Sequence, residues 1–293
     1  MRYRHVAGGK PALPGSKLRR VPRGRRLEAS RSVDPGVANH KGSDLPFRGS
    51  YDAEVPASVP TQVWAHRGAR RQAPENTVAA FARALELGAD GVELDARHTA
   101  DDIVVVHHDA AARGLGLLAE RSFAEVRAAR PELPTLDEAL DASRGGLVNV
   151  ELKCLPGEPD YDAGHPLVPL VVDVLTRRAH RDDVLISSFD LEALTRARDA
   201  DPETPTALLT LSGFDPDVAL RLVADGGHAA LHPHLRALHG TRAGAVAERA
   251  HQRGVQLHVW TVNGASRVRR LSTAGVDAVI TDEPDVALRA LSR

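Results

Sequence analysis

The chain has 293 residues, and its 42% share of apolar residues is enough to build a sizeable hydrophobic core. Its 38 basic and 39 acidic residues nearly cancel, and its single cysteine excludes an intrachain disulfide. No stretch approaches the roughly 18 uncharged apolar residues that a transmembrane helix needs. These features predict a cytoplasmic protein without a membrane span.

The first part of the chain differs in charge from the remainder. Residues 1–50 carry twelve Lys and Arg against three Asp and Glu, a net of +9, so residues 51–293 carry a net of −10. The early segment is rich in Gly and Pro, has no helical or strand periodicity, and lacks the apolar stretch of a secretory signal. We therefore predict a disordered basic arm over 1–59 and one folded domain over 60–293. A solvated tail is the favoured interpretation of the arm, and binding to a polyanion or a membrane surface is the alternative.

Short apolar runs alternate with amphipathic stretches from residue 62 onward. Strands are expected at 62–67, 91–97, 103–108, 147–153, 184–189, 206–211, 228–232, 255–262 and 277–281. Helices are expected at 76–87, 137–143, 167–179, 191–199, 216–224, 243–253, 265–274 and 285–291. Such alternation is typical of a parallel sheet that is covered by helices.

Nine strands are one more than an eightfold barrel requires. The polar segment 98–102 is too short for a crossover helix, so the second and third strands are expected to form an antiparallel hairpin. A turn centred near 100–101 would place His108 opposite Glu93. Eight βα units then remain. The predicted fold is an α/β TIM (β/α)₈ barrel with a small insertion after the second strand.

Acidic residues gather at the predicted carboxyl ends of two strands, where TIM barrels place their active sites. The alternation of a strand puts Glu93 and Asp95 on one face of the second strand, and Glu151 and Lys153 on one face of the third barrel strand. Three carboxylates at one barrel mouth would repel one another unless a cation joins them. Oxygen ligands favour Ca²⁺ or Mg²⁺ over zinc. Pairing of the three acids with the abundant arginines is the alternative.

Rare residues support the same location. Lys153 is the only lysine after residue 41, and it lies two residues from Glu151. In an arginine-rich chain, a retained lysine suggests a site that needs a compact point charge. After residue 39, asparagine occurs only at Asn76, Asn149 and Asn263. Trp260 is expected either to wall a ligand pocket or to pack in the core.

The motifs together resemble the glycerophosphodiester phosphodiesterases. The matching runs, which cover about residues 62–291 in order, are AHRGARRQAPENT (65–77), GVELD (91–95), HHD (107–109), PTLDEAL (134–140), NVELK (149–153), ISSF (186–189), WTVN (260–263) and GVDAVITDEP (275–284). This family folds as a TIM barrel with a small insertion, in agreement with the hairpin expected from the residues.

The resemblance implies a role for each matching position. His66 and His108 would be the acid/base pair, and Arg67 would bind the phosphate. Glu93, Asp95 and Glu151 would hold one divalent cation, Ca²⁺ or Mg²⁺. Lys153 and Glu75 would lie beside the metal and the phosphate, and Trp260 would contact substrate. Asn76 would hold the first loop, and an acid at Glu75 could instead complement the start of a helix.

The expected activity is metal-dependent hydrolysis of a small glycerophosphodiester to glycerol 3-phosphate and an alcohol. One alternative is a lysophospholipase D-like activity that releases a cyclic or open lysophosphate, which an apolar pocket rim would favour. A second is a catalytically silent barrel that binds phosphodiesters. No nucleic-acid partner is expected, because Tyr3 is the only aromatic near the basic residues that begin the arm and the domain is acidic.

Overall fold

The computed structural model describes residues 60–178, 183–239 and 242–293, and the predicted basic arm lies outside these residues. Eight parallel strands form the barrel: β1 (Gln62–His66), β2 (Gly91–His98), β6 (Leu147–Leu152), β7 (Val184–Ser188), β8 (Thr206–Thr210), β9 (Ala230–Pro233), β10 (Gln256–Val259) and β11 (Ala278–Thr281). Pairing of β1 with both β2 and β11 closes the sheet. The predicted TIM barrel is confirmed.

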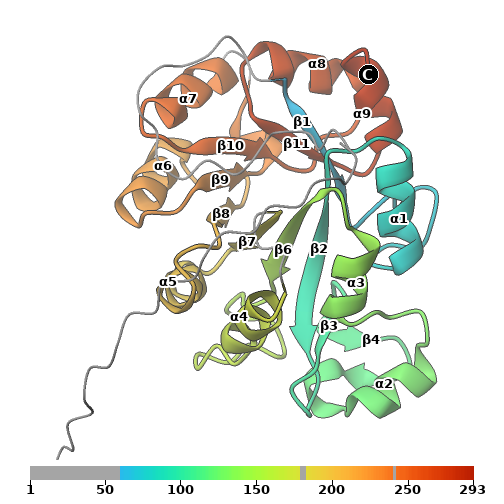
Figure 1. The fold of residues 1–293 in the computed structure, drawn as a ribbon. Coiled ribbons are helices and arrows are strands. Elements are labelled where there is room, and N and C mark those ends of the chain that lie inside the picture. The colour runs from blue at the N-terminus through green and yellow to red at the C-terminus, as the bar shows by residue number, and fades with distance from the viewer. Residues whose placement is uncertain (1–59, 179–182, 240–241) are drawn as a thin grey trace, which may run out of the picture. The chain divides into compact units, whose positions relative to one another are not determined.

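One helix follows each barrel strand and packs outside the ring (Figure 1). These helices are α1 (Val78–Glu86), α3 (Leu136–Ala142), α4 (Leu167–Thr176), α5 (Leu191–Ala200), α6 (Pro216–Asp225), α7 (Arg242–His251), α8 (Ala265–Thr273) and α9 (Pro284–Ala290), with a short 3₁₀ turn η2 (Leu235–Ala237) before α7. Their apolar faces and the outward side chains of the strands form one continuous core. No helix in the described ranges is long and apolar enough to cross a membrane.

The predicted insertion lies between β2 and α3, and α2 and β4 are seen beyond β3 in Figure 1. It contains β3 (Val104–Val106), β4 (Ala111–Ala112), β5 (Gly116–Leu117), η1 (Leu118–Glu120) and α2 (Phe123–Ala129). A small separate core, which includes Val105, Leu118 and Val126, holds it together. Helix α2 is absent from the sequence-based expectations, although Ser122 and Glu125 form a capping box, a pattern that marks a helix start.

The predicted register of the hairpin is wrong by one residue. Strand β3 is antiparallel to β2 as expected, but Ala96 pairs with Val106, and β3 ends there. The shift arises in the turn, where Asp102 takes a left-handed conformation with φ 61° and the loop has three residues. His108 therefore lies beyond the ladder, not opposite Glu93.

Side chains in successive layers fill the barrel beneath its mouth. On β1, Gln62, Trp64 and His66 share the inner face, because alternate residues of a strand point the same way. Trp64 is fully buried one layer below His66, which confirms that it packs in the core. Beside it lie His232 and His258, whose ring nitrogens Nε2 and Nδ1, respectively, are hydrogen-bonded at 2.9 Å. Burial lowers the pKa of His258 to about 4, so this layer is uncharged near neutral pH.

Gly91 gives a test of how tightly β2 and β6 approach each other. A Cβ at this position would lie 2.6 Å from the carbonyl oxygen of Leu147, inside the closest contact that real Cβ atoms make. We expect Gly91→Ala to lower the free energy of unfolding by about 1–3 kcal/mol, because the strands must separate. Urea denaturation measures this. Gly213→Ala is the matched control, because no atom of the described residues lies within 4 Å of a Cβ built at that position. Equal midpoints for the two variants would contradict the packing described.

Candidate active site

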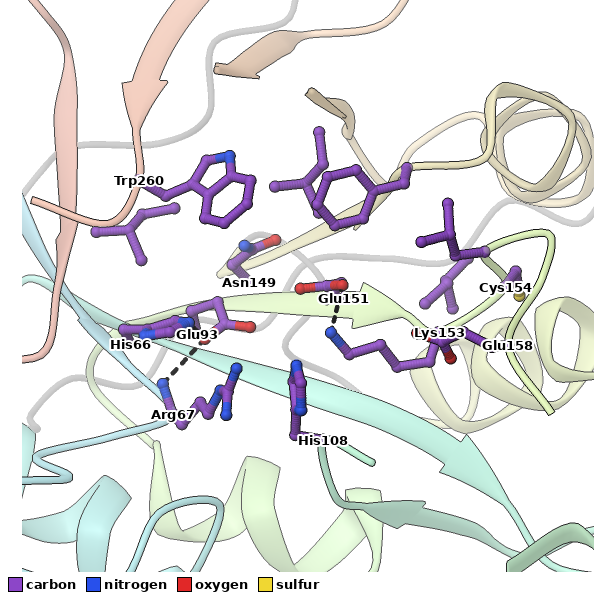
Figure 2. Close-up of a pocket in the computed structure, with 15 residues that line it drawn as sticks. His66, Arg67, Glu93, His108, Asn149, Glu151, Lys153, Cys154, Glu158 and Trp260 are labelled. Atoms are coloured by element: carbon purple, nitrogen blue, oxygen red, sulfur yellow. Dashed lines mark hydrogen bonds and ion pairs between the residues drawn. The ribbon is translucent and has the colours of Figure 1, made fainter. Parts of the chain in front are cut away.

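A cavity opens at the carboxyl ends of the barrel strands, and its two sides differ in chemistry (Figure 2). Its lining residues are His66, Arg67, Glu93, His108, Asn149, Glu151, Leu152, Lys153, Cys154, Leu155, Glu158, Phe189, Leu209, Trp260 and Ile280. Charged groups from β1, β2 and β6 form one side, and Trp260 lies across the cavity from Arg67 and His108. The arrangement suits a ligand with a charged part and an apolar part.

Three carboxylates come together on the charged side, as predicted. Glu93 and Asp95 lie on the inner face of β2, and Glu151 is the register partner of Asp95 on the neighbouring strand β6. One oxygen from each lies within 4.8 Å of the others, and all three residues are buried. Such a cluster needs positive charge nearby, because burial and mutual repulsion both disfavour its ionised form.

Two cations partly meet this need. The Lys153 ammonium lies 2.7 Å from Asp95 Oδ1 and 2.5 Å from Glu151 Oε1. Arg67 places its Nε 3.2 Å from Asp95 Oδ2 and donates its main-chain N–H to Glu93 Oε2 at 2.9 Å. The predicted alternative, pairing of the acids with arginine, therefore holds for Arg67 and Asp95, and it adds to the cluster without separating it.

The neighbouring cations act unequally on Asp95 and Glu93, so these two carboxyl groups differ in pKa. Burial raises the pKa of Asp95, but the charges of Lys153 and Arg67 outweigh it and hold that pKa far below its usual range. Burial, with repulsion from Asp95, raises the pKa of Glu93 to about 8. Glu93 Oε1 is buried and has no hydrogen-bond partner among the described residues. Three carboxylates face two cations, with one buried oxygen unpaired. The donor set therefore fits one hard divalent cation.

The loop after β1 is shaped to present Arg67. Arg67 and Asn76 both take left-handed backbone conformations, each with φ 56°, and the Asn76 N–H donates to the Arg67 carbonyl at 3.0 Å. Asn76 Nδ2 donates to Asp95 Oδ2 at 2.7 Å. Asn76 therefore supports the loop and Asp95 from below and does not line the cavity, which agrees with the role expected for it.

Glu75 lies behind Arg67 and is not among the residues that line the cavity. It accepts a hydrogen bond from Arg67 Nη1 at 2.9 Å and pairs with Arg70. The alternative that Glu75 begins a helix is wrong, because Thr77 caps α1 and no acid lies in its first turn. From outside the cavity, Glu75 holds the guanidinium of Arg67.

His66 is held by a residue that the sequence reasoning missed. Its Nδ1 lies 2.7 Å from Asp282 Oδ1, and Asn263 Nδ2 donates to Asp282 Oδ2 at 2.7 Å. Burial raises the pKa of Asp282, but these two hydrogen bonds outweigh it and keep the pKa low. The ionised Asp282 can only accept, so Nδ1 carries a proton. The ring's Nε2 lies 3.9 Å from Glu93 Oε2 on the cavity side. Asp282 directly follows the predicted strand at 277–281, the eighth strand of the barrel, at a strand end where functional residues are expected.

His108 lies on the cavity side of the insertion. Its Nδ1 lies 2.7 Å from Asp109 Oδ1, and its side chain is 39% exposed. Unlike His66, it has no buried support for its ring in the described part of the chain. Its main chain is held by Arg97 of β2, whose Nε and Nη2 donate to the His108 carbonyl.

The aromatic side of the cavity is built around Trp260. Phe189 and His234 meet its ring edge to face, with centroids 5.6 and 5.0 Å away, and its indole N–H donates to the His232 carbonyl at 2.8 Å. Trp260 therefore lines the cavity and is fixed there. Asn149 also lines the cavity, and neither polar atom of its buried side chain has a hydrogen-bond partner in the described ranges.

The comparisons with known proteins agree with this fold and site. The family model of the glycerophosphoryl diester phosphodiesterase family matches residues 66–286. A glycerophosphodiester phosphodiesterase of Caldanaerobacter subterraneus is 32% identical over 256 residues, covering 80% of this chain and 98% of the relative. One of Bacillus altitudinis is 29% identical, covering 78% of this chain and 97% of the relative.

Two solved structures show the same architecture. A phosphodiesterase of Oleispira antarctica, in complex with the product sn-glycerol-3-phosphate, is 28% identical with a TM-score of 0.69, over 80% of this chain and 98% of its own. A glycerophosphodiester phosphodiesterase of Thermotoga maritima is 26% identical with a TM-score of 0.67, over 78% of this chain and 97% of its own. The fold and site define a TIM-barrel phosphodiesterase. The chain belongs to the glycerophosphoryl diester phosphodiesterase family.

Cys154 lines this cavity and is the only cysteine of the chain, so any thiol alkylation of the protein can be assigned to it. It is buried, and burial with the nearby charge of Asp190 raises the pKa of its thiol to about 12. We expect iodoacetamide at pH 8 to alkylate the folded protein about 10³-fold more slowly than the urea-unfolded chain, because the thiolate is the reactive form. Mass spectrometry measures the rates. Equal rates would show that the Cys154 thiol is accessible and ionises as in the unfolded chain, which would contradict the burial described.

Proposed function

We propose that this phosphodiesterase hydrolyses glycerophosphodiesters to glycerol 3-phosphate and an alcohol, with Ca²⁺ or Mg²⁺ as its cofactor. The observation that carries the proposal is the buried cluster of Glu93, Asp95 and Glu151, with His66 and His108 on the same cavity. The likeness to an enzyme solved with sn-glycerol-3-phosphate supports the substrate class. Glu93, Asp95 and Glu151 would hold the cation, which would supply charge to a nonbridging phosphoryl oxygen.

The two histidines divide the proton transfers. Asp282 keeps a proton on His66 Nδ1, so Nε2 accepts a proton from the attacking hydroxyl as a bond to phosphorus forms. Attack by water gives glycerol 3-phosphate directly, whereas attack by the substrate's own glycerol hydroxyl gives a cyclic phosphate that a water molecule then opens to glycerol 3-phosphate. His108 donates a proton to the alcohol oxygen as its bond to phosphorus breaks. Each such transfer contributes about 10²–10⁴-fold to the rate. The remaining acceleration must come from neutralising the phosphoryl oxygens.

The other cavity residues bind and orient the diester. The guanidinium of Arg67 and the ammonium of Lys153 face the phosphate and offset its charge. Glu75 holds the Arg67 guanidinium in place by its hydrogen bond at 2.9 Å. Trp260 packs against the carbon atoms of the substrate, as the apolar side of the cavity favours. Asn149 offers its two unpaired polar atoms to substrate hydroxyls.

A lysophospholipid is the second candidate substrate, and an apolar rim favours it. Leu209 lines the cavity, and the two large apolar residues that follow it closely in the chain, Leu211 and Phe214, are 56% and 41% exposed. An acyl chain leaving the cavity past β8 would cover such residues. The product would then be a cyclic or open lysophosphate.

A substrate panel tests the proposal directly. We expect the purified protein to release sn-glycerol 3-phosphate from glycerophosphocholine, glycerophosphoethanolamine or glycerophosphoglycerol, with lysophosphatidylcholine assayed in parallel. EDTA should abolish the activity, and added Ca²⁺ or Mg²⁺ should restore it. Coupled enzymatic detection of the product measures the rates. Glu93→Gln keeps the shape of the side chain but loses a charge, so added metal should restore it poorly. Absence of activity with every substrate and metal would overturn the proposal.

Asp282→Asn tests the support of His66. The amide can donate to Nδ1 and so favours the wrong tautomer, as at the aspartate of a Ser-His-Asp triad. We expect kcat to fall at least about 10²-fold with little change in KM. Steady-state kinetics on the preferred diester measures both. Asp285→Asn is the matched control, because Asp285 pairs with Arg289 on α9 and does not line the cavity. An unchanged kcat in Asp282→Asn would exclude this support.

A further inference from the structure

Arg97 is a buried charge for which the reaction described above has no use. It lies on β2 two residues after Asp95, so Glu93, Asp95 and Arg97 share one face of the strand. Its side chain is only 2% exposed. It does not line the cavity, and it does not pair with the carboxylate cluster. Such an arginine is costly to bury unless all of its donors are used.

All five N–H groups of the Arg97 guanidinium have acceptors. Nη1 donates to both carboxylate oxygens of Asp160, at 2.8 and 2.6 Å, and Nη2 donates to Glu158 Oε2 at 2.6 Å. The remaining two donors, on Nε and Nη2, converge on the His108 carbonyl oxygen at 2.9 and 2.7 Å. The planar fork of arginine allows this pattern, and the three donors of lysine cannot reproduce it.

The acceptors come from two segments that are far apart in the chain. His108 lies in the insertion, two residues after the end of β3, and Glu158 and Asp160 lie in the segment between β6 and α4. That segment also supplies Cys154, Leu155 and Glu158 to the cavity wall. Arg97 therefore joins the main chain of His108 to the segment after β6, which forms part of the cavity wall.

Charge balance does not explain this geometry. Glu158 and Asp160 already outnumber the single cation, so pairing alone would leave the Nε edge free for water. Instead, the N–H groups on that edge donate to a neutral acceptor, the main-chain carbonyl of His108. The His108 ring itself has only the exposed Asp109 as a partner in the described structure. The position of the His108 ring therefore depends on how its main chain is held.

We propose that Arg97 is a positioning residue, which holds His108 at the distance from the substrate that proton donation requires and couples that position to the cavity wall at 154–160. The inference rests on the proposed function, because it needs His108 to be the general acid. A displacement of about 1 Å at a catalytic group can cost 10²-fold in rate. Loss of the fork should therefore affect chemistry far more than binding.

Arg97→Lys tests the inference, since it keeps the charge and loses the fork. We expect kcat on the preferred glycerophosphodiester to fall about 10²-fold, with KM within about threefold of the wild type. The loss should be much smaller for a p-nitrophenyl phosphodiester, whose leaving group needs no proton. Arg121→Lys is the matched control, because Arg121 also donates to a backbone carbonyl of the insertion, that of Leu115, and does not line the cavity.

A double-mutant cycle with His108→Ala separates positioning from a general structural effect. If Arg97 acts through His108, then Arg97→Lys should have no further effect on kcat in the His108→Ala background. An equal loss in both backgrounds would overturn the inference while leaving the proposed function intact. Inactivity of the wild type in the substrate panel, by contrast, would overturn the proposed function itself.

A second variant guards against misfolding of Arg97→Lys. Arg97→Met with Asp160→Leu removes the buried pair as a unit, which a fold often tolerates better than the loss of one partner. It should unfold near the wild-type temperature and show the same selective loss of kcat. A wild-type kcat in either folded variant would overturn the inference. Failure of both variants to fold would show that the role of Arg97 is structural alone.

Discussion

The structure depends on one electrostatic constraint, which is the burial of three carboxylates at the ends of two adjacent strands. Asp95 and Glu151 are register partners, so their proximity is built into the pairing of β2 with β6. Lys153 and Arg67 offset part of the charge, and burial together with repulsion from Asp95 raises the pKa of Glu93. Burying these carboxylates destabilises the fold unless a bound cation, alone or together with an anionic ligand, balances their charge. The uncompensated negative charge therefore makes the site suited to a metal ion and, with it, a phosphodiester.

Around this cluster, hydrogen bonds from outside the cavity fix the groups that would react. Asn76 supports Asp95, Asp282 and Asn263 support His66, and Arg97 holds the main chain of His108. None of these supports needs to touch a substrate. Each restricts the motion of a residue in or beside the cavity, which lowers the entropic cost of reaching the reactive arrangement.

Much of the fold and site could be predicted because both follow from local patterns. Apolar alternation located the eight barrel strands to within a few residues, and strand periodicity placed Glu93 with Asp95 on one face. The hairpin register could not be predicted, because it depends on the left-handed backbone of Asp102, a conformation open to Asp but not demanded by it. Helix α2 was not predicted because it is short, although the residues of its capping box are present in the sequence.

The sequence by itself determined the barrel, the insertion and the carboxylate cluster, since each depends on residue type and on spacing within one or two elements. The roles expected for His66 and His108 came only from the resemblance to a family, and the expected place of His108 opposite Glu93 was wrong. Only the tertiary structure decided which distant side chains support the cluster and the two histidines. His66 meets Asp282 because closure of the barrel pairs β1 with β11, the first strand with the last. Arg97 reaches Glu158 and Asp160 because the segment after β6 lies against β2. Contacts between segments that are far apart in the chain leave no periodic pattern, so they become visible only when the strands are placed in register.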